Sequence, residues 1–179
     1  MEKFIEKLSS YNLLNNMLPG VIFCYLIELL FNVNLIKDDV VSNIFIYYFC
    51  GMICSRIGSI IVEYVLKKIK IGNYHFIEFV DHDDFLDASK KDSKIEILSE
   101  TNNTYRSILG LCVLLFITKL YIIILEKLEF LKNFSVYIII IAIFVLFVLS
   151  YKKQTKYITD SVRKNIKNNN GEDTQISHS

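Results

Sequence analysis

The stretch Phe49–Lys70, "FCGMICSRIGSIIVEYVLKKIK", contains the features that decide the fold. Its first half is apolar enough to lie in a lipid bilayer, yet it carries an arginine, Arg56. At roughly 100° per residue, its small residues gather along one side of a helix. These residues are Gly51, Cys54, Ser55 and Gly58. We predict a membrane helix whose small-residue face packs closely against another backbone.

The composition of the whole chain agrees with this interpretation. The protein has 179 residues, is 53% hydrophobic and contains one proline, and its charges are separated into blocks between apolar runs. Because about 20 apolar residues cross a bilayer, four runs qualify as spans: residues 18–33, 41–66, 107–125 and 134–151. The predicted fold is all-α, a four-helix membrane bundle whose long third helix extends into the cytoplasm.

The remaining segments complete the predicted organisation. Residues 18–66 and 107–151 each form a transmembrane hairpin, and Pro19 marks the start of the first membrane helix. The other four segments are an amphipathic interfacial helix (1–17), a cytoplasmic loop with helical parts (67–106), a basic cytoplasmic helix (152–167) and a disordered tail (168–179).

The distribution of basic residues predicts the orientation. Lysine and arginine gather in residues 67–106 and 152–167, whereas the opposite connections hold only Lys37, Lys127 and Lys132. Basic loops stay in the cytoplasm. We therefore expect both termini in the cytoplasm. The heavy use of Ile, Asn and Lys is typical of AT-rich bacteria, so the expected location is the bacterial inner membrane.

A stripe of residues at alternating three- and four-residue spacing follows the third helix. It comprises Ile95, Leu98, Asn102, Tyr105, Leu109, Cys112, Phe116, Lys119, Ile123 and Glu126. This spacing predicts a continuous inward seam like that of a coiled coil, with Asn102 as a register-setting position. The alternative is an accidental repeat in an apolar stretch.

Four ionisable residues fall inside the predicted spans: Glu28, Arg56, Glu63 and Lys119. By helix rise, Glu28, Arg56 and Lys119 lie near the middle of the bilayer. We expect Glu28 to neutralise Arg56 or Lys119, with Glu63 supplying further negative charge. Three interpretations stay open: a structural lock, a polar pathway for ions, or side chains that snorkel to an interface.

The cytoplasmic segments suggest partners rather than chemistry. We expect a set of polar residues to contact a cytoplasmic protein or lipid headgroups: Lys90, Lys91, Lys94, Asn102, Lys152, Lys153 and Lys156. The spacing of His75, Glu78 and His82 would allow a metal, but short acidic runs are usually solvated or cap helices. We therefore predict no metal and no cofactor. The net charge of +1 gives no support for nucleic-acid binding.

Catalytic motifs are missing from the sequence. It has no nucleophile elbow, phosphate-binding loop or metalloprotease helix, and its three histidines lie outside the predicted spans. We therefore expect that the protein is not an enzyme.

Three phrases carry a resemblance to known proteins: "YNLLNNMLPGVIFCYLIE", "CSRIGSIIVEYVLKKIK" and "FLDASKKDSKIEILSETNNTYRS". With them the chain resembles small four-span bacterial inner-membrane proteins of unassigned function. In architecture it is also similar to membrane subunits of phage-defence systems such as Kiwa, from which no functional residue is carried over.

The resemblance implies an oligomeric membrane module that senses or perturbs the envelope, such as a defence sensor or a pore-forming effector with a cytoplasmic partner. The alternatives are a channel or transporter subunit that uses the midplane charges, and a structural membrane anchor for another protein.

Overall fold

The computed structural model describes the backbone of residues 2–176 and the side chains of residues 15–81, 84–164 and 166. It is mostly helical. In chain order the elements are α1 (Glu2–Phe31), α2 (Val40–Ile57), η1 (Gly58–Val62), α3 (Glu63–Lys68), β1 (Lys70–Ile71), β2 (Tyr74–His75), α4 (His82–Lys91), α5 (Lys94–Lys127), η2 (Glu129–Phe134) and α6 (Ser135–Ile176). The two short strands pair as an antiparallel hairpin.

Three stretches of the described chain are long and apolar enough to cross a membrane: Val40–Lys68, Lys94–Lys127 and Glu129–Lys164. The prediction of a mostly helical chain with helices able to span a membrane is therefore confirmed. The apolar part of α1, Asn15–Phe31, is shorter. A fourth span thus stays a prediction, as does a cytoplasmic extension of α5.

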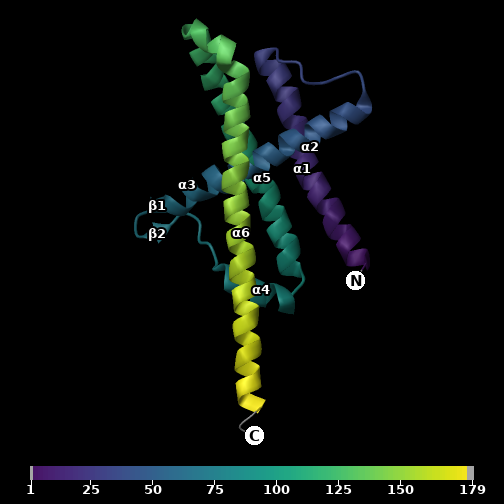
Figure 1. Cartoon of the computed structure of the whole chain (residues 1–179), viewed down its shortest axis with the longest axis vertical. Helices are drawn as coiled ribbons and strands as arrows, with labels where there is room; N and C mark the ends of the chain where they lie inside the picture. Colours follow the sequence, from purple (N-terminus) through teal and green to yellow (C-terminus); the bar gives the residue numbers. More distant parts are fainter. Residues whose placement is uncertain (1, 177–179) are drawn as a thin grey trace.

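Figure 1 shows how these helices are arranged. The α6 helix runs along the whole length of the molecule, α1 and α5 lie beside one another, and α2 crosses them obliquely. The start of α1 and α4 lie at a similar level in the lower half, and α6 continues well below both, whereas η2 and the connection between α1 and α2 lie at the upper end.

The structure corrects the predicted start of the first membrane helix. The α1 helix is continuous from Glu2 to Phe31, so Pro19 lies inside it, and the separate interfacial helix predicted at residues 1–17 is wrong. The Pro19 side chain is fully buried. Membrane helices tolerate such an internal proline because neighbouring helices and local adjustments compensate for the lost backbone hydrogen bond.

The predicted end of the fourth helix is also wrong. The α6 helix continues to Ile176, through most of the segment that we expected to be a disordered tail. No proline interrupts the chain after Ser135, so nothing in the backbone chemistry forces an earlier stop. Residues 177–179 lie outside the described chain.

Glycines set the spacing between α1, α2 and α5. A Cβ atom on Gly20 would collide with the Tyr47 carbonyl of α2, and one on Gly51 would collide with the Asn16 carbonyl of α1. Further along the same side of the helix, a Cβ atom on Gly110 of α5 would collide with the Cys54 carbonyl of α2 and with the Gly58 nitrogen of η1, the latter at 2.7 Å. The α2 helix thus touches two neighbours backbone to backbone.

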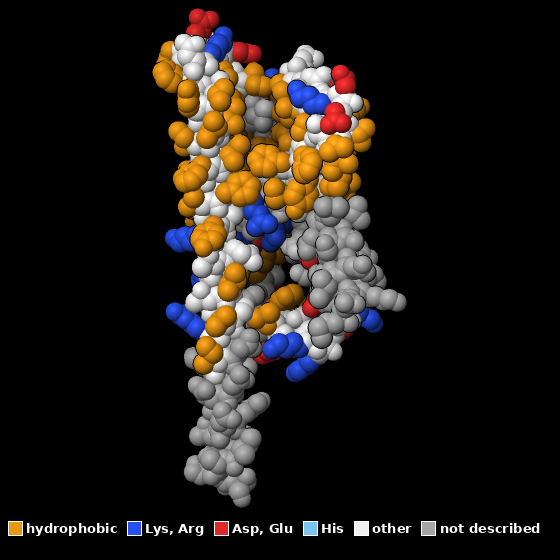
Figure 2. Space-filling view, turned by 45° about the vertical axis from the view of Figure 1, so that its right-hand side comes forward, with side chains coloured by type: hydrophobic (Ala, Val, Ile, Leu, Met, Phe, Trp, Pro, Cys, Tyr) orange, Lys and Arg blue, Asp and Glu red, His pale blue; other side chains and the backbone are white. Residues whose placement is uncertain are grey.

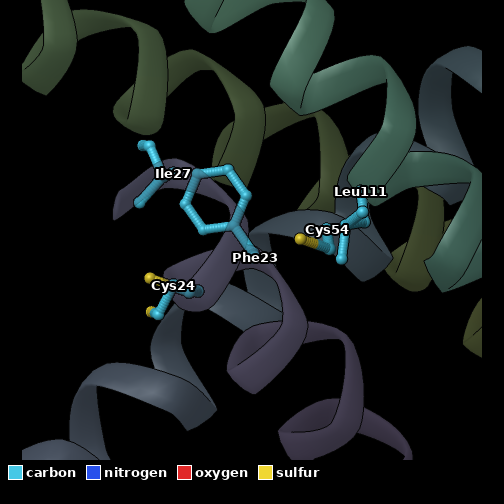
Figure 3. Packing of buried hydrophobic residues seen from close by; sticks show 6 residues of the cluster. Phe23, Cys24, Ile27, Cys54 and Leu111 are labelled. Atoms are coloured by element: carbon cyan, nitrogen blue, oxygen red, sulfur yellow. The ribbon is translucent and has the colours of Figure 1, made fainter. Parts of the chain in front are cut away.

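The hydrophobic core fills the space between the same three helices. Its buried members are Phe23, Cys24, Ile27, Cys50, Cys54 and Leu111. Figure 3 shows the Phe23 ring and Ile27 from α1 beside Cys54 and Leu111 from α2 and α5. The core is therefore a junction of α1, α2 and α5.

We predict that Gly110→Ala destabilises the protein. The added methyl group meets backbone atoms that cannot move aside, a cost of about 1–3 kcal/mol, which exceeds the roughly 1 kcal/mol that alanine gains in helix propensity. The thermal unfolding midpoint in detergent measures the difference. As a control on the same helix, Cys112→Ala changes an exposed position and should leave the midpoint almost unchanged. A Gly110→Ala protein as stable as the wild type contradicts the close contact.

Candidate functional site

The most highly connected charged residue of the described chain is Glu63, at the start of α3. Its side chain is only 9% exposed, and three cations donate to it. The Lys67 ammonium lies 2.9 Å from Oε1, while Oε2 accepts from Arg106 at 3.1 Å and from Lys153 at 2.8 Å. One buried carboxylate therefore joins α3, α5 and α6.

Local structure explains how each partner reaches this carboxylate. Lys67 is one helical turn after Glu63 on the same helix, the i, i+4 spacing that brings side chains together. Arg106 precedes the apolar run of α5, and Lys153 follows the apolar run of α6. Each cation thus stands at the end of an apolar segment, where a membrane protein meets lipid headgroups.

A π-helical turn leads into the site. The Glu63 N–H donates to the Gly58 carbonyl five residues earlier. In a regular α-helix the acceptor lies four residues earlier, so this turn contains one extra residue. Within η1, Ser59 accepts two hydrogen bonds from the Lys153 ammonium, at 2.8 Å to its carbonyl and 2.9 Å to its hydroxyl. Such bulges often occur at functional sites.

Positive charge exceeds negative charge at this site. Three cations surround one carboxylate, and Arg56 lies close enough to Arg106 for the two guanidinium groups to repel each other. The Nε atom of Arg106 is buried and has no hydrogen-bond partner in the described chain. Figure 2 shows Lys and Arg side chains gathered in a hollow below the mainly apolar upper part of one face.

The structure does not bring the four predicted intramembrane charges together. Among the residues with described side chains, Glu28, Arg56 and Lys119 form no ion pair, so the predicted neutralisation by Glu28 is wrong. Glu28 lies one turn before the end of α1 at Phe31. Glu63 pairs with other cations instead.

The predicted inward seam of α5 is also wrong within a single chain. Leu98, Tyr105 and Phe116 are all more than 60% exposed, and Asn102 and Cys112 are exposed as well. The buried residues of α5 are Ser107, Gly110 and Leu111. Small side chains allow α2 to approach this face closely, and in lipid close packing outweighs the apolar pattern.

A polar link connects the lower parts of α1 and α5. The Asn15 amide donates to Glu100 at 2.9 Å, and its oxygen accepts from the Thr104 hydroxyl at 2.8 Å. The sequence analysis did not single out these residues. The signal that could have identified them is a polar residue at every turn in the first part of α5.

The predicted partner-binding residues fall into two groups. Lys90, Lys91, Lys94, Lys152 and Lys156 are exposed, whereas Lys153 is held at Glu63. Exposure leaves the first group accessible to a partner or to headgroups, and the contact with Glu63 gives Lys153 a structural role.

The α4 helix is tied to α6 by an ion pair. Asp87 accepts from Lys164 at 3.0 Å, and this ammonium lowers the pKa of the Asp87 carboxyl below its usual value. Among the described side chains, no three His, Cys, Asp or Glu residues gather as a metal site. The His82 side chain is outside the described set.

Comparisons with protein-family models, curated proteins and solved structures found no match to this chain.

We predict that Glu63→Gln lowers the stability of the protein by about 3 kcal/mol, or roughly 6–12 °C in the unfolding midpoint. The neutral amide leaves three cations close together without their counter-charge. Thermal unfolding in detergent measures the loss.

The matched control is Glu129→Gln. Glu129 also pairs with a lysine, Lys132 at 3.7 Å, but its side chain is 85% exposed, so the loss should stay below about 0.5 kcal/mol. Equal losses in the two variants would show that the Glu63 contacts contribute no more than a surface ion pair.

Proposed function

We propose that the protein is an oligomeric, four-pass module of the bacterial inner membrane that senses or perturbs the envelope, with both termini in the cytoplasm. The observation that carries this proposal is the exposed Lys119 ammonium on an otherwise apolar part of α5. The apolar part of α1, Asn15–Phe31, supplies the fourth pass.

Lys119 has no ion-pair partner among the described side chains. It lies about 12 Å from the end of α5 at Lys127, by helix rise. Its closest aromatic contact is the Phe31 ring, 5.8 Å from the ammonium. A lysine within the hydrocarbon costs about 2.5–3.5 kcal/mol on insertion scales. A second copy packed on this face, or water between copies, removes that cost.

The contacts at Glu63 support a sensing role. They join α3, α5 and α6 at a single carboxylate, so a displacement of one membrane helix must strain its contacts with the other two. The α6 helix continues below this point and holds α4 through Lys164 and Asp87. A change in the membrane thereby reaches the segments that we expect in the cytoplasm.

A second candidate function is a channel subunit. Two cations, Arg56 and Lys119, have no ion pair among the described side chains. Unpaired cations along a pathway through an oligomer would favour anions. The resemblance to phage-defence membrane subunits favours the effector or sensor over a dedicated transporter.

We predict that Cys112 forms intermolecular disulfides when membranes are treated with a copper–phenanthroline oxidant. Cys112 is exposed on the same side of α5 as Lys119, two turns away, whereas the other three cysteines are buried. Self-association through this face brings two Cys112 thiols together. Non-reducing gels of membranes at low expression measure the dimer.

The control moves the cysteine to a different helix. In a Cys112→Ser background, Ile140→Cys places a thiol at a 57% exposed position of α6 and should give little dimer. Equal cross-linking from both positions indicates random collision in the membrane and counts against an α5 interface.

We predict that overexpression depolarises bacterial cells and that Arg56→Leu or Lys119→Leu abolishes the effect. These substitutions remove the unpaired cations of the polar pathway without disturbing the Glu63 contacts. A potential-sensitive dye measures the response. Lys127→Leu, at the exposed end of α5, is the matched control and should still depolarise. Wild-type cells with an intact potential contradict a pore-forming effector.

A further inference from the structure

We propose that the cations around Glu63 form a binding site for a phosphate anion at the membrane surface, most directly the headgroup phosphate of an anionic phospholipid. The site is defined by Arg56, Lys67, Arg106 and Lys153. It goes beyond the proposed function, since it requires neither self-association nor a pore.

Charge balance is the first argument. Glu63 contributes one negative charge, and three cations contact it within 3.1 Å. Arg56 adds a fourth positive charge, near enough for electrostatic repulsion with Arg106. The nearest described acid on α5 below Arg106 is Glu100, and Asn15 already donates to it at 2.9 Å. The cluster thus holds positive charge that its own carboxylate does not neutralise.

Hydrogen-bonding capacity is the second argument. The Arg106 Nε is buried without a partner in the described chain, and only NH1 of this guanidinium reaches Glu63. A guanidinium carries five N–H donors in a planar fork that matches the oxygens of a phosphate. The Nε itself is too deeply buried to meet a ligand from outside. The NH2 group is therefore the donor that Arg106 retains for a second acceptor, and Arg56 forms no ion pair with the described acids.

Accessibility is the third argument. The side chains of Arg106 and Lys153 are 29% and 28% exposed, and that of Lys67 is 47% exposed. The cations are therefore partly covered but open on one side. Figure 2 shows Lys or Arg side chains at a hollow along the lower edge of the apolar surface. Basic pockets between membrane helices on the cytoplasmic side typically hold anionic headgroups.

A phosphate also provides a physical reason for the arrangement. Cations that repel one another stay close only if their contacts with counter-charges outweigh the repulsion. A monoanionic phosphate placed against Arg56 and Arg106 adds the acceptor oxygens and the negative charge that Glu63 alone does not supply.

The experiment measures ligand-dependent thermal stability of the full-length protein in a neutral detergent. Three probes are added separately: phosphatidylglycerol, phosphatidylcholine and inorganic phosphate. We expect phosphatidylglycerol to raise the unfolding midpoint and phosphatidylcholine to leave it unchanged. A response to phosphatidylglycerol alone assigns the site to lipid, and a response to inorganic phosphate as well assigns it to phosphate in general. A response to neither anion overturns the proposal.

Two variants connect the response to the site. Arg106→Gln removes the central guanidinium, and Arg56→Gln keeps the Glu63 contacts intact, so the test survives if the first variant is unstable. Each should weaken apparent binding about tenfold, the effect of losing one charge-assisted hydrogen bond. The matched control, Lys70→Gln, removes an exposed positive charge from β1 and should bind like the wild type. Equal weakening in Lys70→Gln and Arg56→Gln would show only non-specific attraction and would overturn the proposal.

Discussion

The close approach of α2 and α5 at Gly58 and Gly110 is the constraint on which the rest of the structure depends. A Cβ atom on Gly58 would collide with the Arg106 carbonyl, and one on Gly110 would collide with the Cys54 carbonyl. Hydrophobic burial provides little driving force between helices in lipid, so tight van der Waals contact of this kind holds them together. The same contact places Arg106 beside the helix turn that carries Glu63.

The ion-pair network follows from that spacing. Sliding α5 by one helical turn, about 5.4 Å, would remove Arg106 from Glu63 and break a contact of 3.1 Å. Burying charges costs more than their attraction returns unless the geometry is favourable. The Glu63 contacts are therefore better understood as a device that fixes helix register than as a large source of stability. The π-helical turn before Glu63 also helps to fix this register, because Ser59 within it accepts hydrogen bonds from Lys153.

Sequence patterns predicted the structural features that depend on local composition and residue spacing. The long apolar helices and the small-residue face around Gly51 and Gly58 follow from composition and spacing. The pairing of charges does not, because it depends on how far each helix continues. Depths counted from Leu18 placed Glu28 near the middle of the bilayer, whereas α1 ends at Phe31, one turn after Glu28. The sequence analysis missed the buried face of α5 because a glycine, and not a row of leucines, forms the contact of α5 with α2.

The two ends of the membrane region differ in how their charged side chains are paired. Next to the segments expected in the cytoplasm, Glu63 lets cations from three helices approach one another within a single chain. Toward η2, Lys119 forms no ion pair with the described side chains, and its ammonium lies 5.8 Å from the Phe31 ring. At the first end one carboxylate joins three helices but leaves surplus positive charge, and at the second end Lys119 has no ion pair among the described side chains.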